Sequence, residues 1–575
     1  MCDKLVYDLS QEVEGTPNVF VRKDWINILD NQNQNYQNNQ CVIDTSQLSN
    51  SNKYMSYREA YLAIPMLLTV LTPLTAAGSY PIGDYAIGLK NWFGSVIHSF
   101  TLDYNGTTIV QQTPFINMWN IFKLLTSLSY QEITSIGPTI GFYPDTSGSW
   151  SWQGVASVRG LNVCNNDNAF GPTITSSFSI NDYNQYNVVN NEGGNEGLTA
   201  RTKWISYDPL NGGTLVSLTA YGTVGITAAS CQQVWKSYIS KQQYASSTVN
   251  GVLQISVMGT VYLRHLHSFF NMVPLLKGVF MKLTMNLNNS SASVTMTGNT
   301  TAGLISAYTS TVPVGGVLPI LVPSIATGSA WMASGNAGTF NYNLSVGSTC
   351  LDNNISSNAA VSTGTLAKSI YLYVPAYTFN PVFEQAYLSN PVKQIKYTDV
   401  YQYQILNQAS AQNINSLITN GIANIKSVLI IPFFSNNTAG TAYVEYQSPF
   451  DPAGCGTTAP MVTIGNFNVQ ISGQNAIYNT QRYSFEEFNN QLYGQNSVNG
   501  GLTDGLASGL INYNDFQNSY CYHYVNVERM LPAEQSVPKS VQIIGTNYST
   551  QTVNLWVFVE YGVEINIDLY TGARV

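Results

Sequence analysis

Apolar and polar residues alternate along two separate stretches of this chain, and both stretches end in turn-forming residues. The segment Ser99–Leu128 alternates up to Asn105-Gly106, a dipeptide that suits the positive φ angles of a two-residue hairpin turn. A second segment, Asn466–Leu492, alternates in the same way up to Ser472-Gly473. Both patterns predict a strand that turns back on itself in a hairpin.

A short amphipathic helix is predicted after each hairpin. In the first segment apolar residues recur at helical spacing, with Thr113 as the expected N-cap and Pro114 as the first helical residue. In the second segment Ser484 and Glu487 have the spacing of a capping box, and apolar residues follow at helical spacing. The order of strand, hairpin and helix therefore occurs twice.

Two apolar segments that precede the hairpins are as far apart in sequence as the hairpins are. The apolar runs around Ile64-Pro65 and Ile431-Pro432 both predict a mostly buried strand. The distance from Pro65 to Pro432 is 367 residues, and the distance from Gly106 to Gly473 is also 367. This equal spacing indicates a duplicated module, and each copy is expected to close with a long aromatic strand, near 370–379 and 552–568.

The segments between these strands differ in character. Residues 1–50 contain the tract NQNQNYQNNQ, which offers little apolar area and predicts an arm or linker outside the core. Long insertions are expected in the first copy at about 130–250 and 290–366, the second of them as an extra hairpin domain or a mobile decoration. The polar and aromatic stretch from 380 to 405, with two Asn-Pro steps, is interpreted as a connector rather than a core strand, so we place the module boundary near Asn390.

Composition favours an all-β protein with at least two cores. The chain has 575 residues, which is more than one ordinary hydrophobic core can organise. Only 9% of the residues are charged, and 12% are aromatic. Neutral polar and aromatic side chains suit pleated surfaces, and the 45 glycines suit tight turns. Helix-rich enzymes usually carry more Glu, Lys and Arg.

Charge and cysteine usage narrow the function classes. The net charge is −8 and the basic residues form no stripe, so sequence-specific nucleic-acid binding is disfavoured. Seven scattered cysteines without a CxxC pair fit reduced buried thiols and a reducing compartment. We expect neither an export signal nor a transmembrane helix, because the N-terminal residues are acidic and the most apolar run is short and interrupted by proline.

Four segments together resemble the double jelly-roll major capsid proteins of icosahedral double-stranded DNA viruses, most closely those of polinton-like viruses and virophages. The segments are SYREAYLAIPMLL (56–68), NPVFEQAYLSNPVKQIKYTD (380–399), NVQISGQNAIYNTQRYSFEEF (468–488) and 524–561, which runs from YVNVERMLPAEQSVPKSVQI to LWVFVEY. The resemblance implies two consecutive eight-stranded jelly-roll β-sandwiches with short helices and long loop insertions. It divides the chain into an N-terminal arm at 1–50, a first jelly roll at 51–390, and a connector with the second jelly roll at 391–575.

The same resemblance implies a structural function. Three copies would form a pseudo-hexagonal capsomer, and capsomers would tile an icosahedral shell around a double-stranded DNA genome. The implied partners are two further copies, neighbouring capsomers, and penton and minor capsid proteins, and the implied location is the virion after assembly inside the host cell. A surface with few charges suits this role, because a contact between copies then buries few ions without a partner.

Candidate chemistry is sparse, and each case has a simpler structural reading. His265 and His267 would share one face of a strand and chelate a metal, but no third ligand is near and zinc sites need three. Cys521 and His523 have the residue types of a nucleophilic dyad, although alternate positions in an aromatic strand more simply indicate packing. We therefore predict no catalytic residue, no cofactor and no metal.

Three further features also favour structural readings. Glu486 and Glu487 follow a helix cap and complement the helix dipole. The glycine-rich stretch 500–510 lacks the Lys-Ser/Thr of a phosphate-binding loop and is interpreted as a flexible loop. Arg22-Lys23 would reach an internal partner from the arm, yet two basic residues usually form a solvated surface.

Two rival functions follow from other features. A surface adhesin or carbohydrate-binding β-sandwich is the alternative, because aromatic residues in Gly/Asn-rich loops stack on sugars; they are Trp150, Trp152, Tyr183 and Tyr186. That function would be expected with an export signal. A glycosidase on a β-sandwich needs two placed carboxylates, and no pair of acidic residues stands out.

Overall fold

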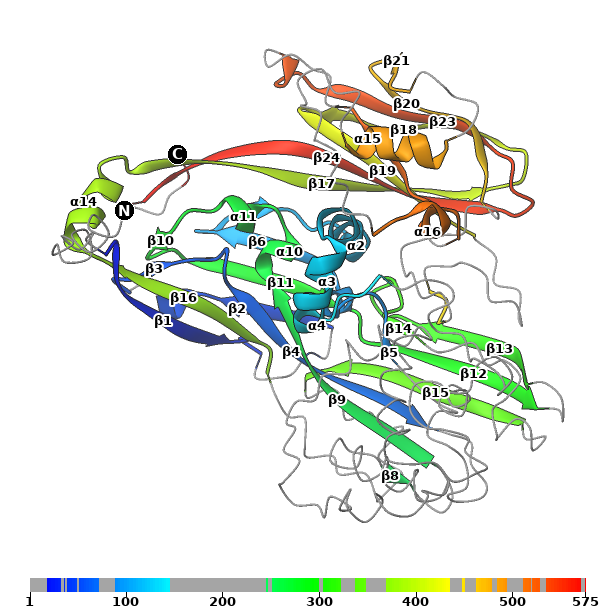
Figure 1. The fold of residues 1–575 in the computed structure, drawn as a ribbon, viewed down its shortest axis with the longest axis horizontal. Helices are drawn as coiled ribbons and strands as arrows, with labels where there is room; N and C mark the ends of the chain where they lie inside the picture. Colours follow the sequence, from blue (N-terminus) through cyan, green and yellow to red (C-terminus); the bar gives the residue numbers. More distant parts are fainter. Residues whose placement is uncertain are drawn as a thin grey trace, which may run out of the picture.

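The computed structural model describes the residues 18–32, 36, 39–48, 51–71, 88–144, 245–246, 251–298, 303–321, 337–347, 369–434, 447–449, 462–477, 483–493, 510–518, 520–527, 534–569 and 574. These residues form mainly antiparallel strands, which assemble into two β-sandwiches side by side (Figure 1). No helix in these ranges has the length and apolar character needed to cross a bilayer.

The first sandwich contains eight principal strands in two sheets. One sheet has the order β1 (Phe20–Leu29), β16 (Tyr371–Phe379), β4 (Tyr61–Leu71) and β9 (Gly251–Tyr262). The other has the order β2 (Gln40–Asp44), β11 (Met281–Leu287), β6 (Ile97–Tyr104) and β7 (Thr107–Val110). Burial alternates along β11, so one face of this sheet packs into the core.

The second sandwich also contains eight principal strands in two sheets. One sheet has the order β17 (Val392–Gln408), β24 (Val553–Asp568), β19 (Ile425–Phe434) and β22 (His523–Asn526). The other has the order β18 (Asn413–Ile422), β23 (Lys539–Asn547), β20 (Ile464–Ile471) and β21 (Gln474–Asn475). Burial also alternates along β23, the counterpart of β11.

The strand order shows that both sandwiches are jelly rolls. When the eight principal strands of each sandwich are numbered in chain order, the sheets read 1-8-3-6 and 2-7-4-5 in both. This order interleaves the first and last halves of each module, as two Greek keys do. The all-β class and the double jelly roll predicted from the sequence are confirmed.

Both predicted hairpins are present at equivalent positions. Asn105 and Gly106 have φ of 44° and 79° between β6 and β7, and Ser472 and Gly473 have φ of 50° and 82° between β20 and β21. Glycine is favoured at the second position because it adopts a positive φ without steric cost. The strands β4 and β19, with their Ile-Pro steps, and the closing strands β16 and β24 are confirmed as well.

The two helices after the hairpins begin differently from each other. Helix α15 (Phe485–Leu492) starts at Ser484, whose hydroxyl accepts the N–H of Glu487 as predicted, while the Glu487 carboxylate accepts a hydrogen bond from Gln491. Helix α2 (Ile116–Ser127) starts two residues later than predicted. Its N-cap is Phe115 with φ of 57°, because the Thr113 hydroxyl donates instead to a carbonyl in the second sandwich.

Residues 20–44 differ from the expected arm. Strand β1 pairs along its length with β16, and β2 pairs with β11, so each supplies an edge strand of the first sandwich. Within the polar tract, Tyr36 is fully buried and its hydroxyl accepts the N–H of Ile370. One buried tyrosine thus anchors a segment whose other residues are polar.

The connector expected from 380 to 405 also differs from the prediction. Helix α14 (Pro381–Leu388) follows β16, with Asn380 as its N-cap, and the 17-residue strand β17 then pairs with β24 over nearly its whole length. The predicted boundary near Asn390 falls between α14 and β17. β17 contains few apolar residues because both ends of the strand have partly exposed faces.

The second insertion extends the first sandwich. β16 covers β4 only at Tyr61–Ala63, and β15 (Ala337–Val346) pairs with β4 from Met66 onwards. β12 (Ser290–Gly298) pairs with β15, and β13 (Gly303–Thr311) pairs with β12, so the insertion continues the sheet rather than forming a separate domain. Most of the first insertion lies outside the described residues.

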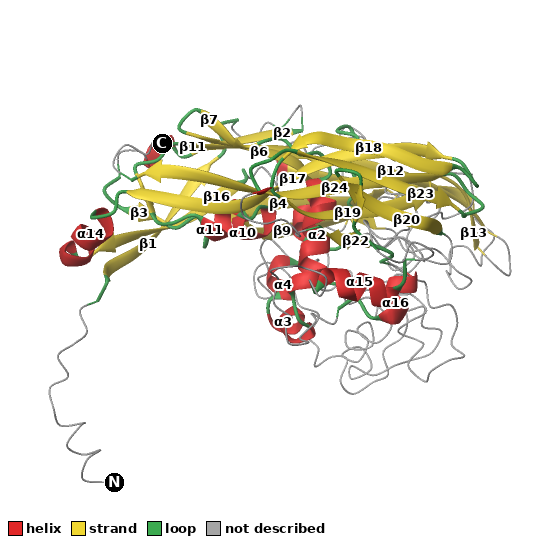
Figure 2. Cartoon of the chain, turned by 90° about the horizontal axis from the view of Figure 1, so that it is seen from above, coloured by secondary structure: helices red, strands yellow, loops and turns green. Residues whose placement is uncertain are grey.

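The remaining elements are short. The strands are β3 (Tyr54–Met55), β5 (Gly88–Leu89), β8 (Ala245–Ser246), β10 (Leu276–Lys277) and β14 (Ile320–Leu321). The helices are η1 (Ser46–Leu48), η3 (Phe93–Val96), α3 (Tyr130–Ser135), α4 (Gly137–Ile140), α10 (Leu263–Leu266), α11 (Phe269–Met272) and α16 (Tyr513–Asn518). Figure 2 shows α2, α3, α4, α15 and α16 on the same side of the strands.

Candidate functional site: the junction and the outer sheet faces

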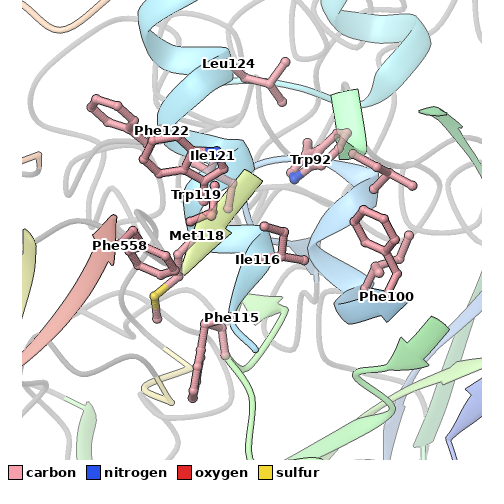
Figure 3. Close-up of a cluster of buried hydrophobic side chains, with 14 of the residues drawn as sticks. Trp92, Phe100, Phe115, Ile116, Met118, Trp119, Ile121, Phe122, Leu124 and Phe558 are labelled. Atoms are coloured by element: carbon pink, nitrogen blue, oxygen red, sulfur yellow. The ribbon is translucent and has the colours of Figure 1, made fainter. Parts of the chain in front are cut away.

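Helix α2 belongs to the first sandwich but packs against the second. Its aromatic side chains meet those of β24: the ring centroids of Phe115 and Trp556 are 5.8 Å apart, and those of Trp119 and Phe558 are 6.3 Å apart. Figure 3 shows Trp119, Met118 and Phe558 in one buried cluster. The helix is therefore buried on several sides and covers the outer face of the sheet β17-β24-β19-β22.

An ion pair accompanies this apolar contact. Lys123 Nζ on α2 lies 3.2 Å from Glu560 Oε1 on β24, and the Ser427 hydroxyl donates to Glu560 at 2.7 Å. Burial raises the pKa of Glu560, but Lys123 and the Ser427 hydrogen bond more than offset it and hold that pKa below its usual value. Burial likewise lowers the pKa of Lys123, and Glu560 raises it above its usual value. Both groups stay charged at neutral pH.

The N-terminal half of β17 makes the second part of the junction. The Tyr397 hydroxyl donates to the carbonyl of Ile109 at 2.7 Å, and the Thr113 hydroxyl donates to the carbonyl of Val400 at 2.9 Å. His267 Nε2 lies 3.3 Å from Asp399 Oδ1, and both side chains are buried. The two sandwiches therefore share an extensive buried contact within one chain.

The corresponding outer face of the first sandwich has no such cover among the described residues. Five aromatic residues lie on it, of which Trp25 is exposed and the tyrosines are partly buried, and we call them the outer aromatic patch: Trp25, Tyr61, Tyr262, Tyr371 and Tyr373. Tyr61 stacks on Tyr373 at 5.0 Å and lies 5.7 Å from Trp25, whose exposed fraction is 52%. Exposed contiguous apolar surface of this kind marks interaction sites.

The two histidines of the RHLH sequence do not share a strand face. His265 lies in helix α10, and His267 follows that helix and contacts Asp399 instead. Within the described ranges no cluster of three or more His, Cys, Asp or Glu is placed to hold a metal ion. His265 and His267 both line a cavity at the junction of the two sandwiches, but they do not form a chelation site.

Cys521 and His523 are both buried in the second sandwich. The His523 ring stacks on Tyr483 at 4.9 Å and meets the edge of Phe467 at 5.0 Å. Burial lowers the pKa of His523 to about 4, and its Nδ1 atom has no hydrogen-bond partner. This environment is that of a packed ring.

The basic pair in β1 is engaged by acids. Arg22 Nε lies 2.7 Å from Asp24, and Lys23 Nζ lies 2.5 Å from Glu59. The hydrogen bond to Glu59 raises the pKa of Lys23. Both charges are thus compensated within the chain.

Other predicted features lie outside the described residues. These are the four loop aromatic residues proposed for sugar stacking, Trp150, Trp152, Tyr183 and Tyr186, and the glycine-rich stretch 500–509. Sequence reasoning also missed the role of α2 as a bridge between sandwiches. A signal was present, because apolar residues occur on more than one side of this helix, and they are Ile116, Met118, Trp119, Ile121 and Phe122.

The sequence matches no protein-family model and no curated protein. Among solved structures, the chain is similar to a Sputnik virophage chain (11% identity, TM-score 0.42, covering 97% of this chain and 88% of that chain). It is also similar to the mavirus major capsid protein (10%, 0.43, 99% and 92%) and to the Faustovirus major capsid protein (9%, 0.41, 96% and 92%). The strand orders described above establish that the chain is a double jelly-roll protein.

Proposed function

We propose that this chain is a major capsid protein that assembles as a trimeric, pseudo-hexagonal capsomer and builds an icosahedral shell around a double-stranded DNA genome. It acts by self-assembly and not by catalysis. Its partners are two further copies, neighbouring capsomers, and penton and minor capsid proteins, and its location is the virion. The observation that carries this proposal is the contact of α2 with the second sandwich.

This contact joins equivalent parts of unlike sandwiches. The helix after the fifth strand of one jelly roll covers the outer face of the 1-8-3-6 sheet of the other. Repeating the same contact from the second sandwich requires α15 to cover the corresponding face of a first sandwich. Among the described residues α15 makes no contact with that face within one chain, so a second copy would supply it.

The surfaces needed for the repeated contact are present. The outer aromatic patch lies on the corresponding face of the first sandwich. On the other side, Phe485 of α15 packs against Tyr513 of α16, which is 51% exposed. Three chains contain six jelly rolls, so six similar contacts close a ring with no open end.

The charge pattern and the cysteines fit the same function. A surface with few ions loses little solvation free energy when copies pack together. Cys41 and Cys521, the cysteines within the described residues, are both buried, and burial raises the pKa of Cys41. Inert thiols suit assembly in the reducing interior of a host cell.

The test is the mass and shape of the purified full chain. Light scattering after size-exclusion chromatography should give three times the chain mass of 63.0 kDa, and electron microscopy should show pseudo-hexagonal particles. Trp25→Glu and Tyr513→Glu should each reduce the trimer fraction, because each places a charge in the contact. Tyr130→Glu is the matched control, since Tyr130 is 70% exposed on α3 and belongs neither to the outer aromatic patch nor to α15 or α16.

Two results would count against the proposal at different levels. A wild-type chain that stays monomeric at high concentration contradicts the capsomer itself. Trimers that form equally well with Trp25→Glu, Tyr513→Glu and Tyr130→Glu leave the capsomer standing but exclude the contact between α15 and the outer aromatic patch.

A further inference from the structure

A cavity of about 220 Å³ lies beside the first turn of α15 in the second sandwich. The helices α15 and α16 line it with Phe485, Tyr513 and Phe516. Val462 and Ile464, at the start of β20 and just before it, line it from the other side. Its volume is below the roughly 300–1,000 Å³ of small-molecule sites. A cavity of this size suits one large side chain better than a ligand.

The cavity has an aromatic wall and opens at the surface. The ring centroids of Phe485 and Phe516 are 5.6 Å apart, and those of Phe485 and Tyr513 are 5.8 Å apart in an edge-to-face arrangement. Tyr513 is 51% exposed, and Glu486, which also lines the cavity, is exposed. Because aromatic rings favour stacked and edge-to-face contacts with one another, this wall favours an aromatic occupant.

The outer aromatic patch presents one side chain of this kind. Trp25 is 52% exposed, whereas the other tryptophans of the described ranges are buried, namely Trp92, Trp119 and Trp556. Its ring is held in place before any contact forms, because it lies 5.7 Å from the Tyr61 ring and 5.4 Å from Lys23 Nζ. Strand β1, which carries Trp25, pairs along its length with β16. A side chain that is already ordered loses little conformational entropy on binding.

The two surfaces carry opposite charges. Around the cavity, residues 483–493 and 510–518 contain three acids, Glu486, Glu487 and Asp515, and no Lys or Arg. Around the patch, Arg264 Cζ lies 4.9 Å from the Tyr262 ring centroid, and the ion pairs of β1 join three cations to two carboxylates. The cations are Arg22, Lys23 and Lys53, and the carboxylates are those of Asp24 and Glu59. Opposite charges favour contact of the cavity surface with the patch over contact of either surface with itself.

We propose that Trp25 of a second copy inserts its indole ring into this cavity when the trimer forms. The inference rests on the proposed capsomer, in which α15 covers the outer aromatic patch of the next chain. Insertion removes the exposed part of the indole from water and brings Lys23 of that copy towards Glu486 on the cavity wall. A tryptophan that fills a pocket commonly dominates the binding free energy of an interface. Trp25 is therefore the main contact residue of this interface.

Photo-cross-linking of the full-length protein identifies what Trp25 touches. With p-benzoylphenylalanine in place of Trp25, irradiation should link two chains, and mass spectrometry should find the linked residues within 462–464, 483–493 or 513–517. A link within one chain, or a link between chains at other residues, overturns the proposal. The matched control carries p-benzoylphenylalanine in place of Tyr130, which is 70% exposed on α3, and should give no link to these segments.

A pair of substitutions tests the fit of the ring to the cavity. Trp25→Ala removes the inserted ring, and Gln517→Trp fills the cavity from its own wall. Each should raise the chain concentration at which half of the trimers dissociate at least about tenfold, as expected for the loss of a dominant contact. Together they should raise it by less than the product of the two single factors, because the indole introduced at position 517 occupies the space that Trp25 leaves. Tyr130→Ala should behave like the wild type.

The outcomes separate this contact from the capsomer itself. A wild-type chain that stays monomeric contradicts both. Wild-type trimers whose dissociation is unchanged by Trp25→Ala overturn the insertion and leave the capsomer standing, as do two single factors that simply multiply in the double variant. Where Gln517→Trp does not fold, Trp25→Ala decides, because its exposed side chain is not needed for the fold of one chain.

Discussion

The packing of α2 across the junction predicts a measurable coupling between the two sandwiches. Trp119 is 5% exposed and its ring lies 6.3 Å from Phe558, which is fully buried on β24. Truncating a buried Trp or Phe to Ala usually costs about 3–5 kcal/mol of unfolding free energy. Trp119→Ala and Phe558→Ala should each fall in this range. Their double variant should cost less than the sum by about 0.5–1.5 kcal/mol, the usual interaction of an aromatic pair.

The assay is urea unfolding followed by far-ultraviolet circular dichroism, at a chain concentration where light scattering shows monomers. Coincident fluorescence and dichroism transitions in the wild type would show that the sandwiches unfold together. Trp25→Ala is the matched control, because this tryptophan is half-exposed and its loss should cost at most about 1 kcal/mol. A Trp119→Ala cost below about 1 kcal/mol, or single costs that add within about 0.5 kcal/mol, would refute the packing of α2 on β24.

Three further substitutions or titrations probe the same fold. Lys123→Met should lower the free energy of unfolding by about 3 kcal/mol at pH 7, which is the low end for a broken buried ion pair because the Lys123 side chain is 43% exposed. The loss should shrink as acid protonates Glu560, and a loss that does not depend on pH would contradict this. Gly106→Ala and Gly473→Ala should each cost about 1 kcal/mol from their positive φ alone, because no atom lies within 4 Å of the added Cβ; unchanged urea midpoints would contradict the turn geometry. Acid should also destabilise the chain between pH 6.5 and 4. Burial lowers the pKa of three imidazoles to about 4, those of His98, His265 and His523, so the unfolded chain binds more protons than the folded chain in this window. Urea midpoints that stay constant from pH 6.5 to 4 would exclude this effect.

Local signals predicted the parts of the fold that local chemistry determines. The hairpins at Gly106 and Gly473 follow from turn residues that tolerate positive φ, and β4 and β19 follow from continuous apolar runs. The N-cap at Ser484 likewise depends on residues within one helical turn. Such features need no knowledge of distant partners.

Non-local pairing explains what the sequence did not reveal. Strand β1 looks like part of a polar arm, but its hydrogen bonds are completed by β16, about 350 residues later. Strand β17 looks like a connector because Tyr397 and Asp399 meet the first sandwich instead of a core of their own. The polar Asn120 looks like a solvated helix position until β17 and β24 are placed beside it. In each case the partner is far away in sequence.

The two equivalent helices differ in how much of their surface is buried. α15 buries only Phe488 and Gln491 among its eight residues, whereas nine of the twelve residues of α2 are buried. The difference arises because α2 has the second sandwich on its far side and α15 has no equivalent neighbour within the described chain. A helix that is apolar on two sides is stable only when both are covered, so α2 fixes how the second jelly roll sits on the first. That geometry sets the angle between the outer faces of the two sandwiches, and in the proposed capsomer this angle would decide whether three chains close into a ring. Substitutions that loosen α2 should therefore impair assembly even when each jelly roll still folds.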